Sequence, residues 1–429
     1  KDFWILKVNP ENGNLNQLDR QHDDAWISGP GIGRDIKWVS SDIFYFQSES
    51  TGYSHLYTYE VNSNIKTQLT DGNWEVQSVQ LSKDSKTFYI SGNKEHPGIT
   101  HFYSLPVRGG KLQQITSRKG GNEVTLSPDE KWLAINHSTM NKPWDLFLQG
   151  NNIKQQAIQI TKSTTPEFDS YPWREPDMVK FQNRYGDDIY ARIYPAKKSH
   201  SNRPAVVFVH GAGYLQNVHF WWSQYFREYM FNNLLADHGY TVIDIDYTAS
   251  SGYGRKHRTG IYRHMGGKDL TDQVDGVKYL VEHYEVNPEN VGIYGGSYGG
   301  FITLMGMFTE PNVFKSGAAL RSVTDWAHYN HGYTANILNT PVEDPIAYKR
   351  SSPIYFAEKF KGNLLMLHGM VDVNVQFQDI VRLNQRLIEL GKENWELAIY
   401  PVEDHGFVQP SSWTDEYKRI FKLFENTLK

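Results

Sequence analysis

The sequence contains no cysteine in 429 residues, which excludes disulfide bonds and thiolate metal sites. No stretch approaches the roughly 18 uninterrupted apolar residues that a membrane-spanning helix requires, so no membrane span is expected. The chain also lacks a strong charge of one sign. Its formal net charge of -4 comes from mixed acidic and basic residues without a basic run, which argues against nucleic acid as a partner.

The start of the chain lacks a methionine and a signal peptide, because the sequence opens with Lys1 and Asp2. We interpret the chain as part of a longer protein or as a processed product. Aromatic residues, in contrast, are abundant. The 27 tyrosines and 12 tryptophans favour β-rich structure and substrate pockets. A length of 429 residues accommodates two or three domains.

The most informative motif is the hexapeptide Gly-Gly-Ser-Tyr-Gly-Gly at residues 295–300, which contains the pattern G-x-S-x-G. An apolar, strand-like segment precedes it at residues 290–294, and a helix-like segment follows at residues 301–305. A serine on a strained turn between a strand and a helix needs glycine neighbours, because a Cβ atom there would collide with adjacent backbone. Ser297 is therefore the predicted nucleophile of a serine hydrolase.

Two further residues complete a predicted catalytic triad. Asp372 follows the strand-like residues 363–367, and His405 follows the strand-like residues 395–400, at the strand ends where open α/β sheets bind ligands. The chain order Ser, Asp, His is that of the α/β-hydrolases. His405 would accept the serine proton, and Asp372 would orient the imidazole. The alternative is that this histidine and this aspartate are ordinary surface and loop residues.

A glycine-containing loop after another strand predicts the oxyanion hole. The strand-like residues 205–209 lead into the loop 210–213, where an α/β-hydrolase places one backbone N–H donor. We assign this donor to Gly211 and the other to the backbone N–H of Tyr298. His210 either helps to position the loop or only packs.

Residues 1–165 are predicted to form an all-β partial β-propeller of about three to four blades. Leu-Thr or Ile-Thr pairs recur about every 45 residues, as do Ser-x-Asp turns that each precede a short strand. A period of roughly 40–50 residues is typical of propeller blades with four short strands each. Residues 3–8 would close a further blade. Since closed propellers have roughly four to eight blades, we expect the missing ones in an absent N-terminal part. A β-sandwich with accidental periodicity is the alternative.

A proline-rich connector at residues 165–176 marks a boundary, and residues 166–429 are predicted to form an α/β-hydrolase catalytic domain. Near-continuous apolar runs are typical of buried parallel strands, and helical patterns alternate with them. The expected fold is a doubly wound, mostly parallel sheet. The expected strands include residues 205–209 and 240–245, and the expected helices are residues 225–237, 268–284, 376–390 and 413–428.

Four features together resemble the prolyl oligopeptidase family of serine peptidases. They are the preceding propeller-like repeats and the motifs Gly-Gly-Ser-Tyr-Gly-Gly at 295–300, His-Gly-x-x-Asp-x-Asn-Val at 368–375 and Asp-His-Gly-Phe at 404–407. The similarity covers essentially the whole chain, as the C-terminal half of such an enzyme, and looks strongest to the dipeptidyl-peptidase IV branch. It implies cleavage of peptides after proline or alanine, release of N-terminal dipeptides, and no metal or organic cofactor. It also implies a secreted or periplasmic location and a possible homodimer.

The resemblance further implies a proline pocket. The branch lines this pocket with a valine, a tryptophan and two tyrosines, which match Val323, Trp326, Tyr329 and Tyr333. By the same resemblance, Asn374 binds the carbonyl group of the residue before the proline, and Val375 packs the pocket. Together with Tyr298, these side chains would form a flat-walled apolar box that suits a rigid pyrrolidine ring. The alternative is that the aromatic residues are ordinary core on an amphipathic helix.

The sequence departs from the branch at the residues that would enforce dipeptide release. The branch carries a glutamate pair that grips the free N-terminus of the peptide, and no Asp-Trp-x-Tyr-Glu-Glu-like segment is present. Asn336 matches an arginine that braces this pair, and Gly296 stands where the branch commonly has tryptophan. The alternatives are an acylaminoacyl-peptidase or broad oligopeptidase of the same family, a carboxylesterase, or a non-catalytic interaction protein or inactive fragment on a hydrolase scaffold.

Overall fold

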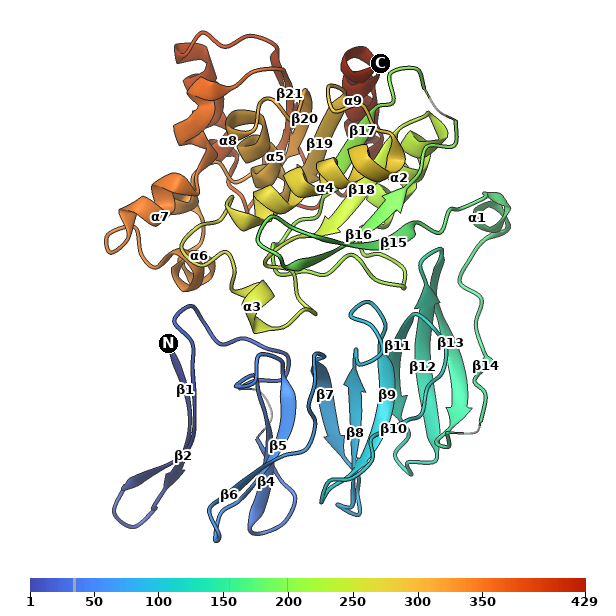
Figure 1. Cartoon of the computed structure of the whole chain (residues 1–429), viewed down its shortest axis with the longest axis vertical. Coiled ribbons are helices and arrows are strands. Elements are labelled where there is room, and N and C mark those ends of the chain that lie inside the picture. Colours follow the sequence, from blue (N-terminus) through green and yellow to red (C-terminus); the bar gives the residue numbers. More distant parts are fainter. Residues whose placement is uncertain (34–35, 154, 199) are drawn as a thin grey trace. The chain divides into compact units, whose positions relative to one another are not determined.

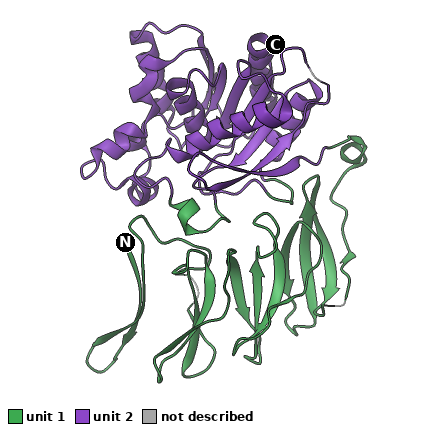
Figure 2. Cartoon of the chain, viewed as in Figure 1, with its two compact units in different colours: residues 1–173, 219–223, 251–259 green, residues 174–218, 224–250, 260–429 purple. Residues whose placement is uncertain are grey.

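The computed structural model describes residues 1–33, 36–153, 155–198 and 200–429. The chain divides into two compact units (Figure 2). Unit 1 consists of Lys1–Trp173, His219–Ser223 and Ser251–Thr259, and unit 2 consists of Arg174–Val218, Gln224–Ser250 and Gly260–Lys429. Two short segments from the second half of the sequence therefore belong to the first unit.

Unit 1 is built from antiparallel sheets that follow one another along the chain (Figure 1). In the described part, three sheets have four strands each, and each sheet comes from one continuous stretch of sequence. This architecture confirms the predicted all-β partial propeller. The strands are β3 (Lys37–Trp38), β4 (Ile43–Ser48), β5 (His55–Glu60), β6 (Ile65–Gln68), β7 (Val76–Leu81), β8 (Thr87–Gly92), β9 (His101–Pro106), β10 (Gln113–Gln114), β11 (Gly121–Leu126), β12 (Trp132–Thr139), β13 (Lys142–Gly150) and β14 (Ile158–Gln159).

The first residues form a two-stranded antiparallel sheet of β1 (Asp2–Val8) and β2 (Leu15–His22). The sequence predicted residues 3–8 as a closing strand of a blade and missed β2. Its residues are mostly polar and give little apolar alternation to detect. Ile5 of β1 is buried in a cluster with Phe44 and Phe46 of β4, so this hairpin packs against the next sheet.

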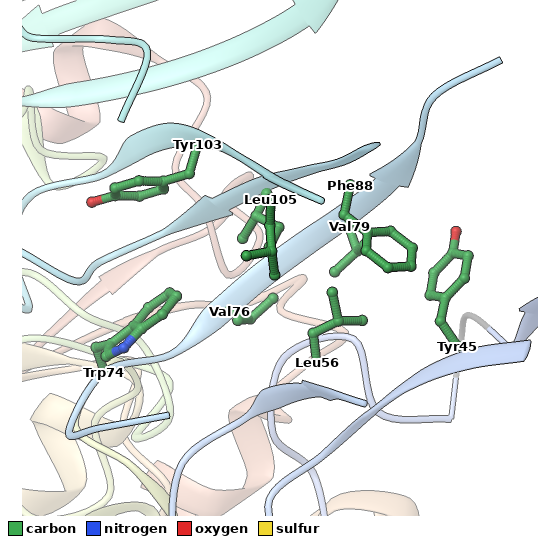
Figure 3. Close-up of a cluster of buried hydrophobic side chains, with 9 residues drawn as sticks. Tyr45, Leu56, Trp74, Val76, Val79, Phe88, Tyr103 and Leu105 are labelled. Atoms are coloured by element: carbon green, nitrogen blue, oxygen red, sulfur yellow. The ribbon is translucent and has the colours of Figure 1, made fainter. Parts of the chain in front are cut away.

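Buried side chains join neighbouring sheets of unit 1 (Figure 3). Tyr45 of β4 and Phe88 of β8 meet edge to face, with ring centroids 4.9 Å apart. Because side chains alternate along a strand, Phe88 and Ile90 face this cluster while Tyr89 belongs to the cluster shared with the following sheet. The sheet of β7 to β10 thus buries both faces. The other members of the cluster in Figure 3 are Leu56, Trp74, Val76, Val79, Tyr103 and Leu105.

The threonine that recurs in the sequence has a structural role in each four-stranded sheet. Thr70 Oγ1 accepts a hydrogen bond from the Leu56 N–H at 3.0 Å and lies 3.0 Å from His55 Nδ1. Thr116 repeats this arrangement with the corresponding residues of the next sheet, and Thr161 again accepts a backbone N–H. The period seen in the sequence therefore reflects a side chain that satisfies a strand N–H where the outer strand has ended.

Unit 2 contains one eight-stranded sheet with the order β15-β16-β18-β17-β19-β20-β21-β22. Strands β15, β16 and β18 pair antiparallel, and all pairs from β18 to β22 are parallel. This sheet confirms the predicted doubly wound, mostly parallel α/β fold. Its strands are β15 (Asp177–Gln182), β16 (Asp188–Tyr194), β17 (Ala205–Val209), β18 (Thr241–Asp246), β19 (Val291–Gly296), β20 (Ser316–Leu320), β21 (Asn363–Gly369) and β22 (Trp395–Tyr400).

Helices cover both faces of this sheet. A Cβ atom added at Gly292 of β19 would meet Phe424 of α9, whereas the adjacent Ile293 approaches Gly306 of α5, and successive strand residues point to opposite faces. The predicted helices agree with the observed ones to within a few residues. The helical elements of unit 2 are α2 (Phe226–Asp237), α4 (Lys268–Tyr284), α5 (Tyr298–Thr309), α6 (His331–Leu338), α7 (Pro345–Arg350), α8 (Phe377–Glu389), α9 (Pro410–Leu428) and the 3₁₀ turns η1 (Trp326–His328) and η2 (Pro353–Lys359).

Unit 1 also contains the short helices α1 (Pro166–Ser170) and α3 (Arg255–Arg258). Among the described residues, no helix has both the length and the apolar character needed to cross a bilayer.

Candidate active site

Ser297 lies at the junction between strand β19 and helix α5, in a strained backbone conformation with φ 59° and ψ -117°. Its neighbours must be small. A Cβ atom at Gly295 would lie 2.3 Å from the carbonyl oxygen of Val209, and one at Gly299 would lie 2.0 Å from the same atom. The glycines thus allow the end of β17 to approach the turn, and the turn presents Ser297 at the carboxyl end of the sheet.

Asp372 follows β21 and His405 follows β22, and His405 Nδ1 donates to Asp372 Oδ2 at 2.8 Å. The other carboxylate oxygen, Oδ1, accepts two backbone N–H groups, from two and three residues further along the chain. Burial alone would raise the pKa of Asp372, but hydrogen bonds from His368 and His405 hold it well below its ordinary value. The ionised carboxylate therefore fixes the His405 ring with Nδ1–H toward Asp372 and leaves Nε2 as a proton acceptor.

Ser297 and His405 line one cavity of about 470 Å³. Within the described part of the chain, no hydrogen bond joins their side chains. Catalytic hydrogen bonds are often long before substrate binds and shorten in the complex. The structure therefore brings the three predicted triad residues to the same edge of the sheet, with the carboxylate–imidazole pair already formed.

The predicted oxyanion donors have different surroundings. Tyr298 is the first residue of α5, and N–H groups in a first helical turn have no intrahelical acceptor. Its hydroxyl donates to Asp269 Oδ2 at 2.6 Å, which anchors the side chain. Gly211 lines the cavity, but its N–H donates to the hydroxyl of Tyr225 at 2.9 Å. His210 is fully buried, bonds the carbonyl oxygen of Gly211 and is not among the cavity-lining residues.

An aromatic wall forms one part of the cavity. The ring of Trp326, in the 3₁₀ turn η1, lies 5.7 Å from Tyr298, 5.5 Å from Tyr329 and 5.9 Å from Tyr333, measured between ring centroids. Val323 lines the same wall. The tryptophan and Tyr329 are not on an amphipathic α-helix, because η1 ends at His328. Five of the six side chains predicted from the sequence as an apolar box therefore line this cavity.

The remaining two predicted binding residues differ in position. Asn374 lines the cavity, and its Oδ1 accepts a hydrogen bond from the Tyr329 hydroxyl at 2.6 Å. This contact leaves the amide NH₂ group to donate elsewhere. Val375 is buried and lies outside the set of lining residues, and its backbone N–H supports Asp372.

The polar residues of the cavity wall that were not predicted from the sequence include Tyr225, Glu228 and Arg321. Tyr225 and Glu228 come from the start of α2, and Arg321 directly follows β20. None of them belongs to a recognisable motif. The one available sequence signal is the short apolar run at residues 317–320 before Arg321, which was not predicted as a strand.

Fold and site together define an α/β-hydrolase arranged around a serine, histidine and aspartate, preceded by propeller blades. Two family models match the chain: the Prolyl oligopeptidase family over residues 225–429 and the Dipeptidyl peptidase IV (DPP IV) N-terminal region over residues 2–144. The chain belongs to the prolyl oligopeptidase family and resembles its dipeptidyl peptidase IV-like members.

Individual relatives agree with this assignment. The chain is 30% identical over 419 residues to dipeptidyl peptidase 8 of Homo sapiens, covering 86% of this chain and 45% of that protein. It is 30% identical over 441 residues to dipeptidyl peptidase 8 of Mus musculus, covering 91% of this chain and 48% of that protein. The chain thus spans about half the length of these curated relatives. The crystal structure of Porphyromonas gingivalis dipeptidyl peptidase 4 shares its fold with a TM-score of 0.86 at 22% identity, covering 100% of this chain and 60% of that one.

Proposed function

We propose that this chain carries the active site of a serine peptidase that cleaves after proline or alanine and releases N-terminal dipeptides. The observation that carries the proposal is the aromatic wall of the cavity that Ser297 also lines. Trp326, Tyr329 and Tyr333 present flat ring surfaces in the cavity that Ser297 and His405 line. A pyrrolidine ring is rigid and apolar, so it fills such a space without losing rotamer entropy.

In the proposed reaction, Ser297 Oγ attacks the carbonyl carbon that follows the proline, while His405 Nε2 accepts the serine proton. Asp372 stabilises the imidazolium that forms. The oxyanion receives hydrogen bonds from the backbone N–H of Tyr298 and from the hydroxyl of Tyr225. His405 then protonates the leaving amine, and water releases the acyl group by the reverse steps.

Asn374 supplies the hydrogen bond that positions the peptide. Since Tyr329 occupies its Oδ1 atom, the amide N–H groups are oriented to donate to the carbonyl oxygen of the residue before the proline. In this assignment the aromatic wall selects the residue whose carbonyl group is attacked, and Asn374 fixes the residue before it.

The test is hydrolysis of a Gly-Pro chromogenic amide with a free amine beside its N-acetylated form, with Ser297→Ala as the control. Cleavage of only the free-amine substrate, lost in Ser297→Ala, supports a dipeptidyl peptidase. Cleavage of the acetylated substrate assigns the chain to the acylaminoacyl-peptidases or oligopeptidases instead. Cleavage of neither, with Ser297 unlabelled by a fluorophosphonate probe, contradicts the proposed peptidase activity of this chain.

A further inference from the structure

A second part of the cavity wall carries charge. Besides the aromatic residues, the cavity is lined by Gly296, Glu228 and Arg321. Glu228 is 8% exposed and Arg321 is 9% exposed. Ionised side chains so deeply buried need partners, because removal from water costs several kcal/mol for each unpaired ion.

Arg321 occupies the space beside Gly296. A Cβ atom at Gly296 would lie 3.0 Å from Arg321 Nη2 and 3.2 Å from its Nε, so a larger residue at position 296 would displace the guanidinium group. The guanidinium carbon lies 5.5 Å from the ring centroid of Phe407 and 5.3 Å from that of Trp413. These rings and the glycine hold the positive charge at the edge of the cavity.

One carboxylate, that of Glu416, pairs with this guanidinium, and a second, that of Glu228, lies near enough to interact with its charge. Glu416 Oε2 lies 3.4 Å from Arg321 Nη1, and among the described residues the other oxygen, Oε1, has no hydrogen-bond partner although it is buried. Glu228 Oε1 accepts a hydrogen bond from the Tyr417 hydroxyl at 3.1 Å. Burial raises the pKa of Glu416 to about 7 and also raises that of Glu228. Because one guanidinium offsets only one carboxylate, burial favours a retained proton on the pair, and a cation in the cavity would take the place of that proton.

The position of His405 indicates which side of the cavity the leaving peptide occupies, and therefore how near it lies to the charged cluster. This residue protonates the leaving amine in the proposed mechanism, so the departing peptide lies on its side of the nucleophile. The residue after it, Gly406, lines the cavity, and Phe407 packs on Arg321. The charged wall therefore adjoins the position of the leaving group, whereas the aromatic wall surrounds the acyl part.

We propose that Glu228 and Arg321, with Glu416 buried behind them, form the floor of a subsite for the first residue of the leaving peptide, and that this subsite takes a lysine or arginine side chain. The proposal rests on the peptidase function proposed above. Glu228 meets the cation, because it is the carboxylate of the pair that lines the cavity. An acidic side chain is disfavoured there, since Arg321 offsets only one of the two carboxylates and a third carboxylate would lack a cation.

The experiment compares peptides that differ only in the residue after Gly-Pro, which is lysine, norleucine or glutamate. We expect kcat/KM for the lysine peptide to exceed that for the norleucine peptide by about tenfold, because a partly buried charge pair is worth that much. In Glu228→Gln the ratio of the two values falls to near one. The matched control Glu282→Gln, at an exposed position of α4, keeps the ratio of the unmodified chain.

Binding to the Ser297→Ala variant, measured by calorimetry, separates this proposal from the peptidase function. Tighter binding of the lysine peptide than of the norleucine peptide supports the subsite even where the chromogenic amide is not cleaved. Equal binding and equal kcat/KM of the two peptides, or a preference for glutamate, overturns the proposal. A lysine preference that survives in Glu228→Gln also overturns it. The order of kcat/KM for the three peptides is measured with the unmodified chain. It therefore tests the proposal even if Glu228→Gln fails to fold.

Discussion

The hydroxyl of Tyr225 accepts a hydrogen bond from the N–H of Gly211 at 2.9 Å, and both residues line the cavity that contains Ser297. The Gly211 N–H is thereby engaged within the protein. Burial raises the pKa of Tyr225 above its ordinary value, so the phenol stays protonated and its O–H can donate to an oxyanion. The Tyr225 hydroxyl is therefore a side-chain donor next to the Gly211 N–H, which the sequence predicted as the second oxyanion donor.

Tyr225→Phe removes this donor and leaves the ring in place. We expect kcat to fall by about 10²-fold with a smaller change in KM, because an oxyanion donor acts mainly in the transition state. The measurement is steady-state hydrolysis of the Gly-Pro amide. Tyr284→Phe is the matched control, since its hydroxyl contacts Asp177 and lies outside the cavity lining. An unchanged kcat in Tyr225→Phe would contradict this role of Tyr225 and would favour Gly211 as the second oxyanion donor.

The contact between Tyr329 and Asn374 gives a prediction for substrate positioning. Tyr329→Phe removes the 2.6 Å hydrogen bond that fixes the Asn374 amide. We expect a loss of about fivefold in kcat/KM, since a hydrogen bond of this kind is worth roughly 1 kcal/mol. Asn374→Ala should cost at least as much.

A double-mutant cycle checks whether the two residues act together. If Tyr329 acts through Asn374, adding Tyr329→Phe to Asn374→Ala causes little further loss, because the coupled contact is already gone. Fully additive effects of the two substitutions would contradict this explanation and indicate that Tyr329 contacts the substrate by itself.

The turn that carries Ser297 predicts an effect on stability. A Cβ atom at Gly299 would lie 2.0 Å from the carbonyl oxygen of Val209, and backbone atoms cannot yield as a flexible side chain does. Gly299→Ala should therefore destabilise the protein by several kcal/mol or prevent folding of unit 2. Thermal unfolding followed by circular dichroism measures this effect. Gly332→Ala is the control, because the nearest atom to its added Cβ lies 3.8 Å away. Equal melting temperatures of the two variants would contradict the steric argument.

The sequence was most informative where a function demands an unusual backbone. Ser297 could be predicted because glycines must flank a strained strand-to-helix turn, and Asp372 and His405 could be placed because each follows an apolar strand. The repeated threonines could be detected because the same hydrogen bond recurs in each four-stranded sheet. These signals are local in the chain.

The parts that the sequence did not predict depend on side chains from distant elements. Arg321 looks like an ordinary polar residue after a strand, and only the fold brings it to Glu416 of α9. Tyr225 reaches Gly211 from a neighbouring helix start without a motif that marks it. Strand β2 was missed because its polar residues give no period of two.

A buried carboxylate in unit 1 makes the stability of that unit depend on pH. Glu75 is 2% exposed, and burial raises its pKa from 4.5 to about 7 despite the nearby Arg258. Arg258 pairs with a second buried carboxylate, Glu49, which opposes ionisation of Glu75. In the unfolded chain Glu75 loses its proton at an ordinary pKa near 4.5.

The sign of the pH effect follows from these two pKa values. Between pH 4.5 and pH 7 the folded state retains a proton that the unfolded state releases, so the free energy of unfolding falls as the pH rises. The stabilisation that the raised pKa provides is complete below the pKa of Glu75 in the unfolded chain. It is lost as the pH rises through the pKa of Glu75 in the folded protein. Glu75→Gln removes this titration and keeps the shape of the protonated side chain.

We therefore expect Glu75→Gln to gain stability relative to the unmodified chain as the pH rises from 5 to 8, by up to about 3 kcal/mol. Urea unfolding of both proteins at several pH values measures the difference directly, and the difference cancels the titrations that the two proteins share. Glu123→Gln, at an exposed position of β11, should show no such change. Parallel stability profiles for Glu75→Gln and the unmodified chain would mean that Glu75 ionises in the folded state as readily as in the unfolded one. The charge of Arg258 would then compensate fully for the burial of Glu75.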